Sequence, residues 1–176
     1  NGCEMNWNDP FIQALENAPT ADMARLKNDK NLSLARVGSN RLIYLHLDSN
    51  RDVSPFVTDK QGKPLTKNPL KDARVRKAIS LALNRDAIVS RVMEGEAVAA
   101  GQPLPDGYPG TSKNLKPDKF DAAQAKKLLA EAGYPDGFGI TIHAPNNRYV
   151  NDEQIAQAVA QMLTRAGIAT KVDAMP

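Results

Sequence analysis

The hydrophobic pattern is clearest between residues 68 and 95, where two apolar stripes follow one another. Apolar residues that recur every three or four positions are typical of an amphipathic helix. Asn68-Pro69 disfavours helix just before the first stripe, and Asp72 can accept from the free N–H groups of a first turn. The segment therefore predicts two consecutive helices that pack together as one unit. Their inward residues are Val75, Ile79, Ala82 and Leu83, then Ile88, Val89, Val92 and Met93.

Polar residues and glycines mark further helix ends. Asn84 or Asp86 can begin the second of these helices, and Gly95 can end it in left-handed backbone. Asp121, with a glutamine three residues later, resembles a capping box in front of another apolar stripe. Gly133 stands where that third helix would end. The sequence thus predicts a helix between residues 121 and 133.

The last third of the chain alternates between strand and helix patterns. Residues 139–144 and 168–172 are short runs rich in apolar and β-branched residues, which is typical of strands. Between them lies a helical pattern that we expect Asn151 to cap. A strand, a helix and a strand in this order predict a right-handed βαβ unit with parallel strands.

The remaining segments predict one short helix, two strands and two loops. A helix is expected to begin at Thr20 and end near Asn28, and residues 32–37 and 42–47 are expected to form strands. The polar segment that follows contains a possible weak hairpin at residues 59–62. Residues 97–116 are rich in glycine and proline, which predicts a long extended loop.

Composition indicates a globular protein and gives no argument for nucleic acid or a membrane surface as partner. The chain has 176 residues, of which 41% are hydrophobic and 24% charged, and its net charge is +3. Charge this mild and this well mixed does not favour a nucleic acid or a membrane surface as partner. A single cysteine, Cys3, excludes an internal disulfide and a cysteine-based zinc site. The opening residues do not form a signal peptide.

Patterns typical of catalysis or metal binding are weak. His46 and His143 lie in predicted strands without an acidic or cysteine partner at ligand spacing, so we expect ordinary strand histidines. The pair Asp152 and Glu153 is interpreted as charge at a helix start. Neither a nucleophile elbow nor a phosphate-binding loop occurs. We therefore predict no catalytic residue, no metal site and no cofactor.

One loop is a better candidate for binding. Asn146, Asn147, Arg148 and Tyr149 link the end of a predicted strand to the start of a helix, which is where open α/β sheets bind ligands. Arginine offers a planar fork of donors that suits a carboxylate, and tyrosine offers an apolar plate with a polar tip. The alternative is that Arg148 is solvated or paired with Asp152.

Three sequence stretches resemble a known family. They are Pro-Leu-x-Asp-x-Arg-Val-Arg-x-Ala at residues 69–78, Ala-Leu-Asn-Arg-x-x-Ile at 82–88, and Ala-Lys-Lys-Leu-Leu-Ala-Glu-Ala-Gly-Tyr-Pro-Asp-Gly-Phe at 125–138. In this order they resemble the substrate-binding proteins of peptide/nickel/opine-type ABC transporters, extracellular solute-binding protein family 5. The resemblance extends over roughly residues 17–176.

The resemblance implies a fold and a domain organisation. The fold class is α/β: an incomplete lobe of the type II periplasmic binding protein kind, with a mixed sheet flanked by helices. Residues 1–37 would be an N-terminal segment with a remnant of the first lobe, and residues 38–176 a second lobe truncated at its C-terminus. The inter-lobe hinge would include Gly38, Asn40 and Arg41.

The resemblance also implies a function. Two lobes would close over a solute in the periplasm and dock on an ABC transporter permease; the protein would be a monomer. Oligopeptides or dipeptides are the first expectation, with nickel chelates, opines and oligosaccharides left open. In dipeptide-binding relatives an arginine of an Arg-x-Tyr-Asn loop holds the ligand carboxylate. Arg148 and Tyr149 match that loop in kind, but here the intervening residue is missing.

Two other functional classes remain as alternatives to a solute-binding protein. The chain could be a hydrolase- or transferase-like α/β enzyme domain, or a protein-interaction module with a large exposed apolar patch. Arg74, Arg76 and Lys77 are a candidate docking face for the transporter, with a solvated helix face as the alternative.

Overall fold

The computed structural model describes residues 20–33 and 41–176, in two compact units that divide between Val37 and Gly38. In the first unit a 3-10 turn, η1 (Thr20–Asp22), leads into α2 (Met23–Asn28). The predicted end of this helix is confirmed. Its predicted cap is wrong, because Thr20 begins the 3-10 turn and Asp22 stands at the cap position of α2 without a side-chain cap bond.

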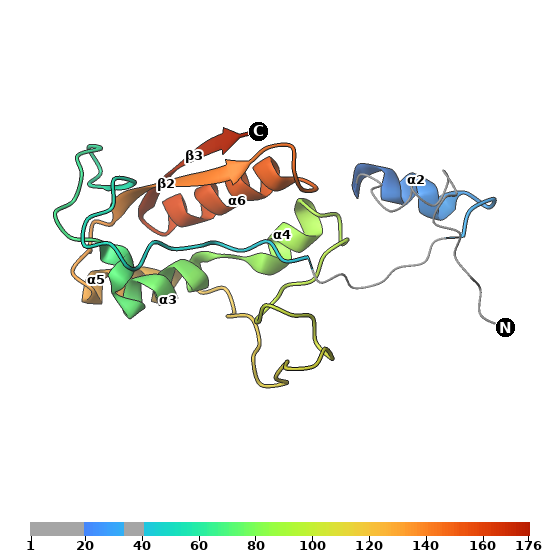
Figure 1. Cartoon of the computed structure of the whole chain (residues 1–176), viewed down its shortest axis with the longest axis horizontal. Coiled ribbons are helices and arrows are strands. Elements are labelled where there is room, and N and C mark those ends of the chain that lie inside the picture. Colours follow the sequence, from blue (N-terminus) through green and yellow to red (C-terminus); the bar gives the residue numbers. More distant parts are fainter. Residues whose placement is uncertain (1–19, 34–40) are drawn as a thin grey trace. The chain divides into compact units, whose positions relative to one another are not determined.

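The second unit is built on a three-stranded mixed sheet in the order β1-β2-β3 (Figure 1). The short β1 (Val57–Thr58) is antiparallel to β2 (Phe138–Pro145), and β2 is parallel to β3 (Ile168–Met175). The parallel pair is in register over its whole length, from Phe138 opposite Ile168 to Pro145 opposite Met175. The predicted parallel strand–helix–strand unit is therefore confirmed.

Three α-helices of the second unit begin at a polar side chain that accepts from a backbone N–H. Asp72 accepts from the Arg74 N–H (2.8 Å) at the start of α3 (Ala73–Ala82). Asn84 accepts from the Ala87 N–H (2.9 Å) at α4 (Arg85–Arg91). Asp121 accepts from the Gln124 N–H (2.8 Å) at α5 (Ala122–Glu131). These caps are as predicted. The last helix, α6 (Asp152–Arg165), begins differently.

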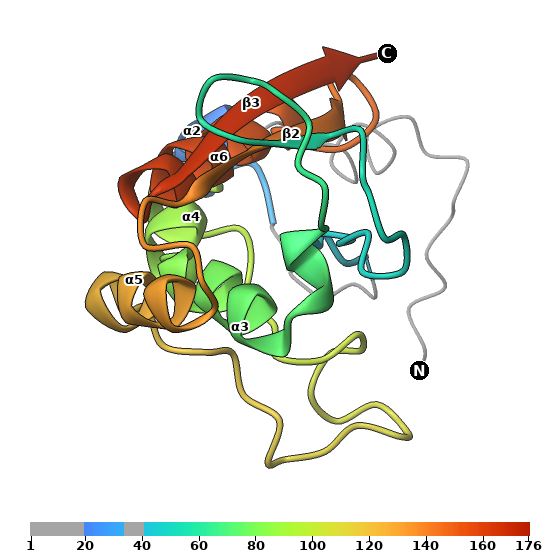
Figure 2. The ribbon, with the colours of Figure 1, turned by 90° about the vertical axis from the view of Figure 1, so that its left-hand side faces the viewer.

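The helices pack against the sheet and against each other. α6 contacts both β2 and β3, and α3 packs chiefly against α5, which lies beside it in Figure 2. The contact of α3 with α4 is small, so the expectation that these two consecutive helices form one packed unit is wrong. Asp121 helps to bring α5 to α3, since its backbone N–H donates to the Leu81 carbonyl (2.9 Å).

The core is aliphatic and continuous across these elements. Deeply buried side chains come from α3, α5, α6, β1 and the starts of the two long strands. They include Val75, Ala78, Ile79, Leu163, Phe138 and Ile168. On β3, by contrast, every second residue from Ala169 to Met175 is exposed. Successive strand residues point to opposite faces, so β3 shows its exposed residues on the face away from the core.

The predicted strand at residues 42–47 is wrong. This segment carries no strand in the structure, although Leu45 and Leu47 are half-buried against the core. Ile43 and Tyr44 are exposed. An apolar run gains strand structure only from a hydrogen-bonded neighbour, and this run packs without one. The other predicted strand, at residues 32–37, and the hinge residues Gly38 and Asn40 lie wholly or mostly outside the described residues.

The two predicted loop features are confirmed. Thr58 forms an isolated bridge with Pro64 across a turn in which Gly62 has φ +88°, so a weak hairpin is present. Residues 97–116 extend away from the helices without regular structure (Figure 1). They are held by Gln102, whose side chain bonds both the N–H and the carbonyl of Ser112 (2.9 and 3.1 Å) and the carboxylate of Asp106 (2.8 Å).

Candidate ligand-binding site

The candidate loop, residues 146–149, follows the carboxyl end of β2 beside the end of β3. The Asn146 N–H donates to the Met175 carbonyl (3.0 Å), which ties the start of the loop to the neighbouring strand. Asn146, Asn147, Arg148 and Tyr149 are all exposed. The structure thus brings the four predicted residues together at the edge where ligands of open α/β sheets bind, but their role as ligand contacts stays a prediction.

Asp152 organises the backbone of this loop. Its carboxylate accepts from the N–H groups of Arg148 and Tyr149 (3.0 Å each) and of Glu153 (2.8 Å). The side chain is buried, which by itself raises the pKa of the carboxyl group. The backbone N–H donors of Tyr149, Arg148 and Glu153 outweigh burial, so the pKa of Asp152 lies below its usual value. Asp152 therefore holds a negative charge at the start of α6.

Asn151 stands at the N-cap position of α6, as predicted, but its side chain does not cap the helix. Asn151 adopts left-handed backbone (φ +55°) and makes no side-chain cap bond. Its Nδ2 instead donates to the Val92 carbonyl (2.7 Å), just after α4.

Arg148 contacts Asp152 through its backbone N–H and not through its guanidinium group. Within residues 20–33 and 41–176, no carboxylate forms an ion pair with its guanidinium group. The Arg148 guanidinium carbon lies 5.4 Å from the centroid of the Tyr149 ring. Of the two alternatives, a side-chain pair with Asp152 is therefore not the arrangement seen, and Arg148 is exposed to solvent.

Arg41 approaches the same ring. Its guanidinium carbon lies 5.9 Å from the Tyr149 centroid, and both arginines are within cation–π range. Sequence reasoning placed Arg41 at the hinge and did not connect it with the loop. No local pattern could have shown this contact, because it joins segments that are far apart in the chain.

Comparison with known proteins decides the family. The family model "Bacterial extracellular solute-binding proteins, family 5 Middle" matches residues 12–176. The chain belongs to this family. The resemblance carried by the sequence motifs is confirmed.

Its curated relatives include a glutathione-binding protein and a dipeptide-binding protein. The glutathione-binding protein GsiB of Pectobacterium atrosepticum is 31% identical over 84% of this chain and 26% of its own length. The dipeptide-binding protein of Escherichia coli K12 is 31% identical over 86% of this chain and 26% of its own length. The chain thus spans about a quarter of the length of these relatives.

A solved structure shows the fold. The ABC transporter-associated periplasmic binding protein DppA from Helicobacter pylori, in complex with the peptide STSA, aligns with a TM-score of 0.66 at 24% identity. The alignment covers 94% of this chain and 30% of that one. The predicted fold class, part of a type II periplasmic binding protein lobe with a mixed sheet and flanking helices, is confirmed.

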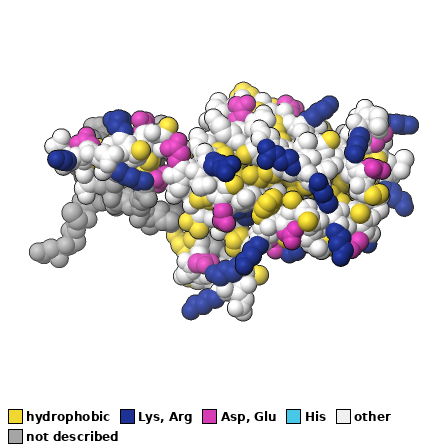
Figure 3. Space-filling view, turned by 180° about the vertical axis from the view of Figure 1, so that it is seen from behind, with side chains coloured by type: hydrophobic (Ala, Val, Ile, Leu, Met, Phe, Trp, Pro, Cys, Tyr) yellow, Lys and Arg dark blue, Asp and Glu magenta, His cyan; other side chains and the backbone are white. Residues whose placement is uncertain are grey.

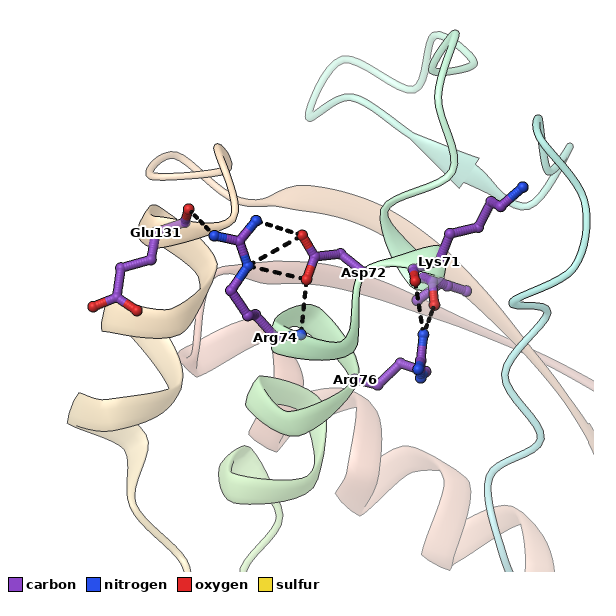
Figure 4. Close-up of polar contacts among 6 residues, drawn as sticks. Lys71, Asp72, Arg74, Arg76 and Glu131 are labelled. Atoms are coloured by element: carbon purple, nitrogen blue, oxygen red, sulfur yellow. Dashed lines mark hydrogen bonds and ion pairs between the residues drawn. The ribbon is translucent and has the colours of Figure 1, made fainter.

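The family motif at residues 69–78 places its charged residues in structural contacts (Figure 4). Arg74 donates through Nε and Nη2 to the Asp72 carboxylate (3.1 and 2.6 Å) and through Nη1 to the Glu131 carbonyl at the end of α5 (2.7 Å). The hydrogen bond from Arg74 lowers the pKa of Asp72. Arg76 donates to the Leu70 and Lys71 carbonyls (3.0 and 2.9 Å).

These contacts bear on the predicted docking face. Lys77 pairs with Asp118 (2.7 Å), so each of the three cations already has a polar partner within the second unit. Arg74 and Lys77 are still half exposed. The idea that this face meets a transporter stays a prediction.

The histidines give no metal site. His46 lies outside any strand and is exposed. The parallel register sets Asp173 opposite His143, with Nε2 3.8 Å from Oδ2, and Phe56 meets the imidazole edge-on at 4.3 Å. Sequence spacing did not reveal this acidic neighbour. In the part of the chain that the structure describes, no three metal-ligating side chains gather, and no helix has the length and apolarity needed to cross a bilayer.

Proposed function

We propose that this chain forms part of the second lobe of a solute-binding protein that serves an ABC import system, with a small peptide as the solute. Membership of family 5 and the names of its glutathione-binding and dipeptide-binding relatives support this proposal. Residues 1–37 would then be the remnant of the first lobe, with the hinge at Gly38, Asn40 and Arg41. The protein would act as a monomer in the periplasm, without catalytic chemistry or nucleic acid.

The observation that carries the proposal is the state of Arg148. Its backbone is fixed by Asp152 and its guanidinium group has no ion-pair partner among the described residues. A guanidinium fork of this kind binds a carboxylate through two parallel hydrogen bonds. We assign Arg148 to the terminal carboxylate of the peptide, Tyr149 to its apolar flank, and Asn146 and Asn147 to polar contacts.

The mechanism would be capture by closure. Two lobes would bend about the hinge until both contact the solute, and the closed form would dock on a membrane permease. Micromolar affinity corresponds to about 8 kcal/mol, and millimolar affinity to about 4 kcal/mol. One exposed loop offers few contacts, so this chain alone should bind peptides weakly, at about the millimolar level.

NMR titration of the 176-residue chain with Ala-Leu tests the proposal. We expect saturable shifts at residues 146–149 that require Arg148 and disappear in Arg148→Gln. Arg165→Gln, at the far end of α6, is the matched control and should leave the titration unchanged. An absence of shifts at this loop with Ala-Leu, a tripeptide, a nickel–histidine chelate, an opine and an oligosaccharide would refute the assigned site.

A protein-interaction module remains the runner-up, because one surface feature favours it. Hydrophobic side chains form a band across the face of the second unit shown in Figure 3, between scattered acidic and basic groups. The exposed apolar residues of this unit include Ile43, Tyr44 and Phe56. Such a band also fits a lobe that packs against further parts of a two-lobed protein. Self-association of the chain, measured by sedimentation velocity, would favour the runner-up.

A further inference from the structure

We propose that the open edge of β3 is a self-pairing surface, where two copies of this chain join their β3 strands antiparallel about a two-fold axis at Val172. The inference goes beyond the proposed function and concerns a surface outside the loop at residues 146–149. The monomer assigned to solute binding would be in reversible equilibrium with this dimer, which forms as the concentration of the chain rises.

The strand β3 lies at the edge of the sheet. In the order β1-β2-β3 it has β2 on one side, and among the described residues no strand pairs with its other side (Figure 1). Its eight residues stay in register with β2 throughout, so no bulge interrupts the edge. A long, regular edge offers unpaired N–H and C=O groups to another strand. The edge of β3 is therefore suited to strand addition.

The hydrogen bonds of β3 show which residues face the open edge. The Met175 carbonyl accepts from the Asn146 N–H (3.0 Å), on the side of β2. Backbone groups of alternate residues point to opposite sides of a strand, so those of Val172 and Ala174 point away from β2. The Thr170 N–H also points away from β2, since it donates to a threonine hydroxyl near the end of α6 (3.2 Å). Val172 and Ala174 therefore present donors and acceptors to a second strand.

The charge pattern of β3 favours one register for self-pairing. When Val172 stands opposite its copy, Lys171 of each chain lies opposite Asp173 of the other, and Ala169 lies opposite Met175. Val172 then forms the hydrogen-bonded pair, and Lys171 with Asp173 forms a non-hydrogen-bonded pair, in which side chains come closest. An axis at residue 171 or 173 would instead place two lysines or two aspartates opposite each other, which is destabilising.

The charged side chains of this register are available to a second copy. Lys171 and Asp173 are exposed on the face of the sheet away from the core. Within residues 20–33 and 41–176, Lys171 forms no ion pair. Asp173 has His143 as a neighbour, but Nε2 and Oδ2 are 3.8 Å apart, beyond hydrogen-bond distance, and the Asp173 side chain is 58% exposed. Its carboxylate can therefore accept from a lysine of the second copy.

Charge reversal at the edge tests the register. One strand pair buries little surface, so the wild-type chain should form a weak dimer whose population in sedimentation equilibrium rises with concentration. Lys171→Glu places acidic side chains opposite each other and should raise the dimer Kd by about tenfold. Asp173→Lys should do the same with basic side chains. Lys126→Glu, which makes the same charge change on the exposed side of α5, is the control and should leave the Kd unchanged.

The two edge variants together give a sharper test. In an equimolar mixture, each strand of one variant meets opposite charges on a strand of the other, so a heterodimer should form although neither variant pairs well with itself. The double variant Lys171→Glu with Asp173→Lys should likewise recover a Kd close to that of the wild type. Neither recovery would follow if the single substitutions had only damaged the fold.

The outcomes separate pairing of β3 from other modes of association. In NMR of mixed labelled and unlabelled chains, the antiparallel register predicts Hα–Hα contacts between Lys171 of one copy and Asp173 of the other. Self-association that persists in both charge variants would overturn the pairing of β3 and favour the apolar band instead. A chain that stays monomeric at the concentrations used for NMR would overturn it too. The Ala-Leu titration at Arg148 depends on neither result, so it tests the proposed function separately.

Discussion

The Asp152 carboxylate accepts a hydrogen bond from the backbone N–H of Arg148 at 3.0 Å. The two residues are four positions apart, and the contact uses the main chain of Arg148 and not its guanidinium group. This contact fixes where the Arg148 side chain begins and leaves its guanidinium group available for other partners. The acid also shapes how the stability of the loop depends on pH.

Asp152→Ala should lower the free energy of unfolding by about 1–2 kcal/mol, as for the loss of a helix cap. The folded-state pKa of Asp152 is depressed, so its contribution is complete above the unfolded value of about 4 and is lost as pH falls through the folded pKa. Urea unfolding of the wild type and the variant from pH 7 to pH 2 measures this difference. It should shrink at the acid end, whereas a difference independent of pH would contradict the assigned role. Glu153→Ala, an exposed neighbour, is the control.

Asp72 has two roles that substitutions can separate. It caps α3 by accepting from the Arg74 N–H, and it pairs with the Arg74 guanidinium group. Asp72→Ala removes both and should lower the free energy of unfolding by about 1 kcal/mol. Asp72→Asn keeps the cap and loses only an exposed ion pair, so it should cost clearly less. Equal losses in urea unfolding would show that the charge and not the cap matters.

Gly137 and Gly167 approach each other where the two parallel strands begin. Gly137 has φ +75°, and a Cβ added there would run into the Gly167 carbonyl oxygen. Gly133 has φ +93° and open space around it, which makes it a matched control for backbone strain alone. Gly133→Ala should cost about 1–2 kcal/mol, and Gly137→Ala a further 1–3 kcal/mol, roughly, from overpacking. Thermal unfolding of both variants compares them, and equal losses would refute the close approach.

Local signals predicted much of this fold. The caps at Asp72, Asn84 and Asp121 and the glycine at position 133 were found because each acts on residues within a few positions of itself. The parallel strands followed from the order of the patterns. The candidate loop was found by the same logic, since a strand end followed by a helix start is visible in the sequence.

The errors share another physical origin. Residues 42–47 have strand composition but lack a ladder partner. Asn151 stands at the cap position of α6, but its side chain makes no cap bond and donates to the distant Val92 carbonyl. The contact of Arg41 with Tyr149 likewise depends on how distant segments pack. A short-range pattern carries no information about such partners.

The bond from the Asn151 amide to the Val92 carbonyl has a consequence for recognition. Together with the contact of Asn146 to the end of β3, it anchors the loop on both sides before any solute arrives. Binding to a loop that is already ordered costs the protein little conformational entropy. If the loop contacts the solute as proposed, its selectivity would depend on the shape of the solute, because these two hydrogen bonds fix the loop at both ends.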